Sequence, residues 1–127
     1  MAGKLEGKKI LLVDDDQDIL ASLQMALADT GATIQTASDG NTAVEMAQTF
    51  QPDLMVLDLM MPKRSGFLVL DTIKKGKKKG DAPRVIMITG NTGMRHRAYA
   101  ESLGVSKYFN KPFRMDRMVE SVMELLS

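Results

Sequence analysis

The sequence predicts an α/β fold with a doubly wound, five-stranded parallel sheet of order 2-1-3-4-5 in three α/β/α layers. Short apolar runs alternate with amphipathic segments five times along 127 residues, with no internal repeat and no linker. Such strict alternation is typical of parallel strands joined by right-handed helical crossovers. Three of the runs are almost wholly apolar and suit central strands that are buried on both faces, whereas the other two suit edges.

The first unit begins with an apolar run at residues 10–13, which we expect to be a buried strand. The helix after it carries apolar residues at helical spacing, with Asp16 or Asp18 as its cap and Gly31 at its end. The next run, residues 33–37, alternates polar and apolar side chains. Alternation indicates a strand with one wetter face, so we expect this strand at an edge of the sheet.

The second helix is expected after Asp39, a plausible cap, and should end before Pro52. Residues 54–57 then form a fully apolar run between turn formers, and we expect a central strand there. Gly66 opens a third helix, which ends in a lysine-rich segment at residues 74–79. A run of like charges is usually solvated, so this segment is expected to be an exposed loop.

The fourth strand is expected at residues 85–88, followed by a helix over about 93–103 that Gly104 stops. A short last strand is expected at residues 107–110, at the other edge of the sheet. The final helix places its larger apolar residues on one face: Met115, Met118, Val119, Val122, Leu125 and Leu126. The resulting strand order is the flavodoxin-like one.

Length and composition predict one domain over residues 1–127, with about the first seven residues as a polar N-terminal tail. The net charge of +1 creates no overall field that would attract nucleic acid or a membrane surface. The chain has no cysteine, which excludes a thiolate metal site and a cysteine nucleophile. No apolar run approaches the roughly 20 residues that span a bilayer. We therefore expect a cytoplasmic protein that binds neither nucleic acid nor membrane directly.

Polar residues that follow four different strands should meet at one rim of the sheet: Asp14 and Asp15, Asp58, Thr89, and Lys111. Three carboxylates about 5 Å apart repel one another by roughly 3 kcal/mol per pair at an effective dielectric constant of 20. A divalent cation removes this repulsion, and an all-oxygen site with few carboxylates suits Mg²⁺. Lys111 and Thr89 add a positive charge and a hydroxyl suited to a phosphoryl group. Asp58 is the residue placed to attack phosphorus, because aspartate is a known phosphoryl acceptor.

The whole chain from residue 8 to residue 126 resembles a receiver domain of the two-component response regulators. Each motif that carries the resemblance falls at the end of an expected strand. The motifs are Leu12-Val13-Asp14-Asp15, Val56-Leu57-Asp58 through Met61-Pro62, Ile88-Thr89-Gly90, and Lys111-Pro112-Phe113.

The resemblance implies that Asp58 is the phosphoacceptor and that Mg²⁺ or Mn²⁺ is the cofactor. Asp15 and Asp58 would bind the metal directly, Asp14 would act through water, and the backbone carbonyl of Met60 would complete the protein ligands. Lys111 would contact a phosphoryl oxygen.

The resemblance further implies that Thr89 and Tyr108 act as a switch and that the Lys111–Pro112 bond is cis. A sensor histidine kinase or a phosphotransfer protein would supply the phosphoryl group. The switch would change the surface formed by the fourth helix, fifth strand and last helix, which would bind an unknown target or a second copy of the chain. The protein would then not be an enzyme, apart from its own phosphorylation by small donors and its own dephosphorylation.

Two departures from the family pattern concern the loops near Asp58. Lys63-Arg64-Ser65 brings positive charge to a segment where the family often has uncharged or acidic residues, which would alter the choice of kinase. Met60 and Asn91 occupy the positions, two residues beyond Asp58 and Thr89, where the family tunes the lifetime of its phosphoryl group.

Two other functions compete with a phosphorylated receiver. A phosphatase of the haloacid-dehalogenase type also uses an aspartate nucleophile, but it needs an acid two residues later, where this chain has Met60. A receiver-like binding module that is never phosphorylated would be expected to lack Asp58, Asp15 or Lys111, and all three are present.

Overall fold

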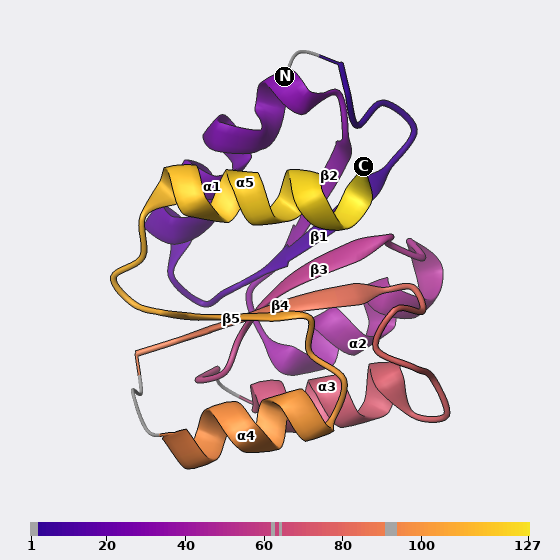
Figure 1. The fold of residues 1–127 in the computed structure, drawn as a ribbon, viewed down its shortest axis with the longest axis vertical. Helices are drawn as coiled ribbons and strands as arrows, with labels where there is room; N and C mark the ends of the chain where they lie inside the picture. The colour runs from indigo at the N-terminus through magenta and orange to yellow at the C-terminus, as the bar shows by residue number, and fades with distance from the viewer. Residues whose placement is uncertain (1–2, 62, 64, 91–93) are drawn as a thin grey trace.

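The computed structural model describes residues 3–61, 63, 65–90 and 94–127, with the side chains of residues 94–96 left out. Five parallel strands form one sheet of order β2-β1-β3-β4-β5, which confirms the predicted fold. Helices α1 and α5 cover one face, and α2, α3 and α4 cover the other (Figure 1). The elements are β1 Lys9–Val13, α1 Gln17–Leu27, the 3₁₀ helix η1 Ala28–Thr30, β2 Thr33–Ala37, α2 Gly40–Thr49, β3 Leu54–Asp58, α3 Gly66–Lys74, β4 Arg84–Thr89, α4 Met94–Ser102, β5 Lys107–Asn110 and α5 Met115–Leu126.

The first two helices begin at aspartate caps. The side chain of Asp16 accepts hydrogen bonds from the backbone N–H groups of Asp18 and Ile19, so Asp16 rather than Asp18 is the cap of α1. Asp39 accepts from the backbone N–H of Thr42 at 2.8 Å and caps α2, as predicted. Each cap satisfies backbone donors that a helix start leaves without an internal partner.

The sheet separates two buried clusters of apolar side chains. In β3, Leu54 and Val56 belong to the cluster under α1 and α5, and Met55 and Leu57 belong to the cluster on the opposite face. Successive side chains of a strand point to opposite faces, so a central strand buried on both faces must be apolar throughout. This pattern confirms the prediction for residues 54–57.

The ends of several predicted elements differ from the structure. β1 starts one residue earlier, at Lys9, β3 extends by one residue to Asp58, and α1 ends at Leu27, with η1 between it and Gly31. β4 extends to Thr89 and starts at Arg84, one residue longer at each end than predicted. Helix α4 ends at Ser102, and Gly104 follows with a left-handed φ of 101°. Residue 93, the predicted start of α4, lies outside the described residues. None of the described helices has both the length and the apolar character needed to cross a bilayer.

The described N-terminal residues do not form the expected polar tail. Leu5 is fully buried and belongs to the same cluster as the apolar residues of α1 and α5. The backbone N–H groups of Gly3 and Leu5 donate to the carbonyls of Asp29 and Thr30 at 2.9 and 2.7 Å. The expectation was wrong because one leucine in a polar segment carries no periodicity that would indicate burial.

The first lysine of the lysine-rich segment is buried rather than solvated. Lys74 is only 4% exposed, and its ammonium donates to the carbonyls of Lys79, Asp81 and Pro83 at 3.5, 2.7 and 3.2 Å. Burial lowers the pKa of Lys74. The three acceptors match the three donors of an ammonium group, so Lys74 holds the loop between α3 and β4 in shape. Residues 75–79 are exposed, as predicted.

Candidate functional site

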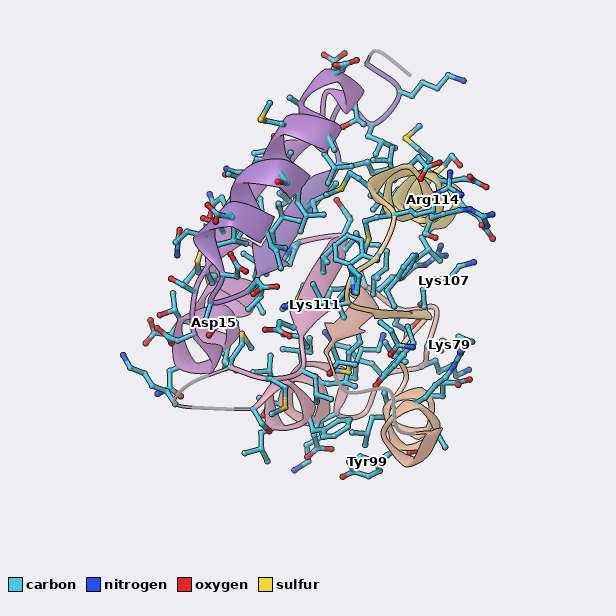
Figure 2. The ribbon with its side chains drawn as sticks, turned by 90° about the vertical axis from the view of Figure 1, so that its left-hand side faces the viewer. Asp15, Lys79, Tyr99, Lys107, Lys111 and Arg114 are labelled. Carbon is cyan, nitrogen blue, oxygen red and sulfur yellow. The ribbon has the colours of Figure 1, made fainter. Side chains whose placement is uncertain are left out.

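Parallel pairing brings the predicted site residues to one rim of the sheet. Asp58 is the last residue of β3 and pairs with Ile88 of β4, so Thr89 lies one residue farther along. Asp14 and Lys111 follow the last residues of β1 and β5. The loops after these strands run along the left-hand side of Figure 1, and Figure 2 looks onto that side, with Asp15 and Lys111 labelled.

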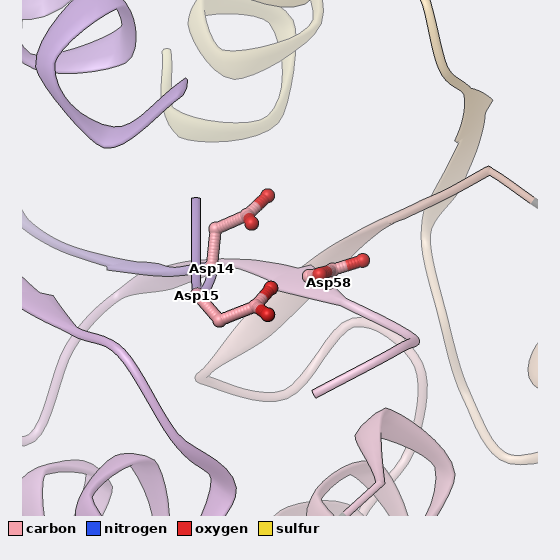
Figure 3. A group of neighbouring side chains, drawn as sticks. All are labelled: Asp14, Asp15 and Asp58. Carbon is pink, nitrogen blue, oxygen red and sulfur yellow. The ribbon is translucent and has the colours of Figure 1, made fainter. Parts of the chain in front are cut away.

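Three carboxylates gather at this rim. Asp14, Asp15 and Asp58 each offer an oxygen, and these oxygens lie within 4.8 Å of one another. Their side chains extend in the same direction from neighbouring strand ends (Figure 3). Asp14 and Asp58 are buried, with 0% and 2% of their surface exposed, whereas Asp15 is exposed. The cluster is thus anchored in the protein and open to solvent through Asp15.

Lys111 is the positive group of the cluster. Its ammonium nitrogen lies 3.1 Å from Asp14 Oδ2 and 3.6 Å from Asp58 Oδ2. Burial acts to lower the pKa of Lys111, but the hydrogen bond to Asp14 and the charges of Asp58 and Asp14 outweigh burial and raise it. Lys111 therefore keeps its positive charge next to the two buried carboxylates.

The electrostatics of Asp58 differ from those of an ordinary carboxyl group. Burial, followed by the neighbouring charge of Asp14, raises the pKa of Asp58 to about 7. Lys111 and the backbone N–H of Met60, which donates to Asp58 Oδ1 at 3.3 Å, act in the opposite direction. One positive charge thus does not compensate the whole acidic cluster.

The donor set fits a hard divalent cation such as Mg²⁺ or Mn²⁺. All ligand atoms on offer are carboxylate oxygens, which these ions prefer. Asp14 Oδ1 accepts the backbone N–H of Asp16 at 2.9 Å, which fixes the orientation of the carboxylate. Within the described part of the chain, the buried Asp14 Oδ2 has no partner other than the Lys111 ammonium. This oxygen is thus available to a cation or to a water molecule that the cation holds.

The two residues expected to switch lie on β4 and β5. Thr89 is fully buried at the end of β4. Tyr108 of β5 is half-buried and packs against the second apolar cluster. The Lys111–Pro112 bond is cis, as expected; the Ala82–Pro83 bond is also cis, which the sequence analysis missed.

One contact in the loop after β3 was not expected from the sequence. The Lys63 ammonium lies 3.8 Å from Asp39 Oδ2, the carboxylate that caps α2, and 64% of its side chain is exposed. Part of the charge that the sequence places beside Asp58 is therefore directed to a neighbouring loop. Pro62, Arg64 and Asn91 lie outside the described residues.

A family model described as the response regulator receiver domain matches residues 10–123. The chain belongs to this family.

Response regulators from several bacteria are similar to this receiver domain over most of its length. PhoP of Bacillus subtilis is 38% identical over 84% of the chain and 43% of its own length. The Regulator of RpoS of Escherichia coli K12 is 35% identical over 99% of this chain and 37% of its own length. MprA of Mycobacterium ulcerans is 32% identical over 93% of this chain and 50% of its own length. The chain thus spans half or less of the length of these curated relatives.

Solved receiver domains have the same architecture. The receiver domain of a LuxO repressor protein from Vibrio parahaemolyticus superposes with a TM-score of 0.85 at 28% identity, covering 94% of this chain and 89% of that one. A CheY-like receiver domain from Methanospirillum hungatei has the same TM-score at 26% identity, covering 94% and 93%. Family and fold agree on a receiver domain, and they do not favour the alternative phosphatase.

Proposed function

We propose that Asp58 accepts a phosphoryl group from a phosphohistidine of a sensor histidine kinase or of a phosphotransfer protein. The observation that carries this proposal is the surroundings of Asp58: two further carboxylates within 4.8 Å and an ammonium group 3.6 Å away. Phosphoryl transfer depends mainly on positioning and on neutralisation of charge, and this set of groups suits both requirements.

In the proposed reaction, an ionised Asp58 oxygen attacks the phosphorus atom. The P–O bond forms, the P–N bond breaks, and the histidine nitrogen keeps the bonding electron pair; a proton on the other ring nitrogen lets the histidine leave as neutral imidazole. The product is an acyl phosphate on Asp58. Lys111 lies on the Asp58 Oδ2 side and would pair with a phosphoryl oxygen in the transition state and in the product.

Asp15 and Asp58 are proposed as direct ligands of Mg²⁺ or Mn²⁺, Asp14 as a ligand through water, and the Met60 carbonyl as a further ligand. The ion would supply positive charge to the transferring phosphoryl oxygens and would hold Asp58 in its ionised, nucleophilic form. Asp14 and Lys111 contact each other at 3.1 Å, so Lys111 stays beside the site before a phosphoryl group arrives.

Phosphorylation is proposed to bias the positions of Thr89 and Tyr108 and thereby the surface of α4, β5 and α5. That surface would then bind a downstream target or a second copy of the chain. We place the protein in the cytoplasm, as a single receiver domain over residues 1–127 that controls an output protein or domain.

A labelling experiment tests the proposed acceptor. The protein is incubated with acetyl phosphate and Mg²⁺, and intact mass spectrometry follows the addition of one hydroxylamine-sensitive phosphoryl group. Asp58→Asn should abolish the addition, whereas Asp71→Asn, at an exposed position of α3, should label like the wild type. Equal labelling of Asp58→Asn would refute the assignment of Asp58.

The same protein preparation distinguishes the receiver function from that of an aspartyl phosphatase. Met60 stands where that phosphatase needs a general acid, and 63% of its surface is exposed. A thioether cannot donate a proton to a leaving group. We therefore expect no steady turnover of a generic phosphate ester, and sustained multiple turnover would favour the phosphatase.

A further inference from the structure

The loop between α3 and β4 carries a concentrated positive charge at the surface. Lys75, Lys77, Lys78 and Lys79 are all exposed. Within the described part of the chain, none of these four lysines takes part in an ion pair. Like charges this close in sequence repel one another, so such a run usually spreads out in solvent. A defined loop at this position therefore needs contacts that offset the repulsion.

Those contacts centre on the buried Lys74. Its ammonium group donates to the carbonyls of Lys79, Asp81 and Pro83. A buried charge is unfavourable unless hydrogen bonds compensate it, and these three bonds exist only while the loop keeps its shape. The Asp81 carboxylate also accepts the backbone N–H of Lys78 at 2.8 Å, and the backbone N–H of Asp81 donates to the Lys78 carbonyl at 3.0 Å. The exposed lysines are thus presented on a fixed backbone.

A groove runs beside this loop. Two hollows of about 220 and 530 Å³ lie between α2 and the loop, and they share Ala47, Gln48, Lys77 and Pro83 as lining residues. The Lys77 ammonium donates to the carbonyl of Ala82 at 3.3 Å, which holds it at the edge of the hollows. We call these two hollows and the four exposed lysines the basic groove. It combines apolar surface, a glutamine amide that can pair with a peptide backbone, and positive charge.

The lining of the basic groove favours a peptide over a nucleic acid. Asp53 lines the larger hollow, and Asp81 lies in the loop itself. A phosphate backbone, with a charge at every nucleotide, would meet these carboxylates, whereas a peptide can place its acidic residues between them. Single-stranded nucleic acid also stacks on aromatic rings, and none of the described residues that line the two hollows is aromatic.

We propose that the basic groove is a docking site for an acidic peptide segment of a partner protein. The loop precedes β4, whereas Asp58 and Thr89 are the last residues of their strands. The basic groove therefore lies at the end of the parallel sheet opposite the acidic cluster (Figure 1). A partner held there leaves the surroundings of Asp58 open, so this proposal does not depend on the proposed function.

A peptide-binding measurement tests the docking site. The probe is a fluorescently labelled peptide of alternating glutamate and alanine, and fluorescence anisotropy at low salt gives its affinity for the unphosphorylated protein. The variant combines Lys75→Gln, Lys78→Gln and Lys79→Gln. Among the described contacts, these three side chains make no hydrogen bond, so the support of the loop by Lys74 is kept. The variant should bind about 3- to 150-fold more weakly, as expected for three exposed ion pairs. Unchanged affinity would overturn the proposal.

Two further variants test the position of the site and the role of the loop shape. Lys107→Gln, Arg114→Gln and Arg117→Gln together remove the same charge from β5 and α5 and should bind the peptide nearly as well as the wild type. An equal loss in this control would overturn the location. Lys74→Met keeps the exposed lysines but frees the loop, so it should weaken binding. Wild-type affinity in Lys74→Met, with circular dichroism showing a folded protein, would refute a preformed site.

The same assay separates other anionic partners. A single-stranded DNA oligonucleotide and phosphatidylserine vesicles replace the peptide at the same salt concentration. Both should bind more weakly than the peptide. Tighter binding of either one, lost in the triple lysine variant, would overturn the acidic peptide in favour of a nucleic acid or a membrane surface.

Discussion

Replacing Asp58 by Asn should stabilise the protein at alkaline pH, although it removes the proposed acceptor. The wild-type carboxyl group is 2% exposed and has a pKa of about 7, raised from 3.8 by burial first and by Asp14 second. Its ionised form is therefore disfavoured in the folded state. The amide of Asn has nearly the same shape, carries no charge, and can still accept the Met60 N–H.

The charges around Asp58 indicate the size of the effect. At 4.8 Å, the upper limit for the acidic cluster, one carboxylate pair repels by about 3.5 kcal/mol at an effective dielectric constant of 20. Lys111, at 3.6 Å from Asp58 Oδ2, attracts by about 4.6 kcal/mol on the same scale. These two contributions nearly cancel, which leaves burial as the main cause of the raised pKa.

The sign follows from proton linkage. Because the folded-state pKa lies above the unfolded value, Asp58 stabilises the fold fully below about pH 4, and this contribution disappears as the pH rises to about 7. At pH 5 the unfolded carboxyl group is already ionised, whereas the folded one keeps its proton until about pH 7. About two of the pH units between pH 5 and pH 8 therefore contribute, and the free energy of unfolding falls by about 2–3 kcal/mol. Asp58→Asn lacks this loss.

Urea denaturation followed by circular dichroism, without divalent cations, measures the effect. The stability of wild type relative to Asp58→Asn should fall by about 2–3 kcal/mol between pH 5 and pH 8. Millimolar Mg²⁺ at pH 8 should restore part of the difference by stabilising the wild type alone. Parallel pH dependence of the two proteins would refute the raised pKa and with it the electrostatic account of the site.

Three further predictions concern residues whose roles appear only in the structure. Lys74→Met should lower the free energy of unfolding by about 1–3 kcal/mol, because it leaves carbonyl acceptors of the α3–β4 loop unpaired. Urea denaturation measures this loss, and an equal loss in Lys75→Met, at an exposed position, would contradict the prediction. Leu5→Ala should cost about 2–5 kcal/mol by opening a cavity, and a melting temperature within a degree of the wild type would show that the N-terminal segment does not contribute. Gly66→Ala should slow labelling by acetyl phosphate, because its new Cβ would lie 2.5 Å from the Asp58 carbonyl oxygen and force the end of β3 to move; labelling at the wild-type rate would count against this coupling.

The sequence alone predicted the fold and the residues that gather at the carboxyl edge of the sheet. Strands at residues 33–37 and 107–110 were predicted to the residue, because apolar patterning and turn residues are local signals. The meeting of Asp14, Asp58 and Lys111 was predictable as well, since the carboxyl ends of parallel strands share one edge. Strand order followed from which runs were apolar enough to be buried on both faces.

The tertiary structure alone decided the environment of individual side chains. The clustered carboxylates predicted repulsion that raises a pKa, but the identity of Asp58 as the group that carries the shift, and burial as its main cause, have no signature in spacing or composition. The same holds for the burial of Lys74 and Leu5 and for the contact of Arg97 with Tyr108. Burial and charge interactions act through distances of a few ångströms between groups from different elements, and a local pattern does not contain those distances. Sequence pattern therefore determined which groups reach the rim, and packing determined how each of them behaves there.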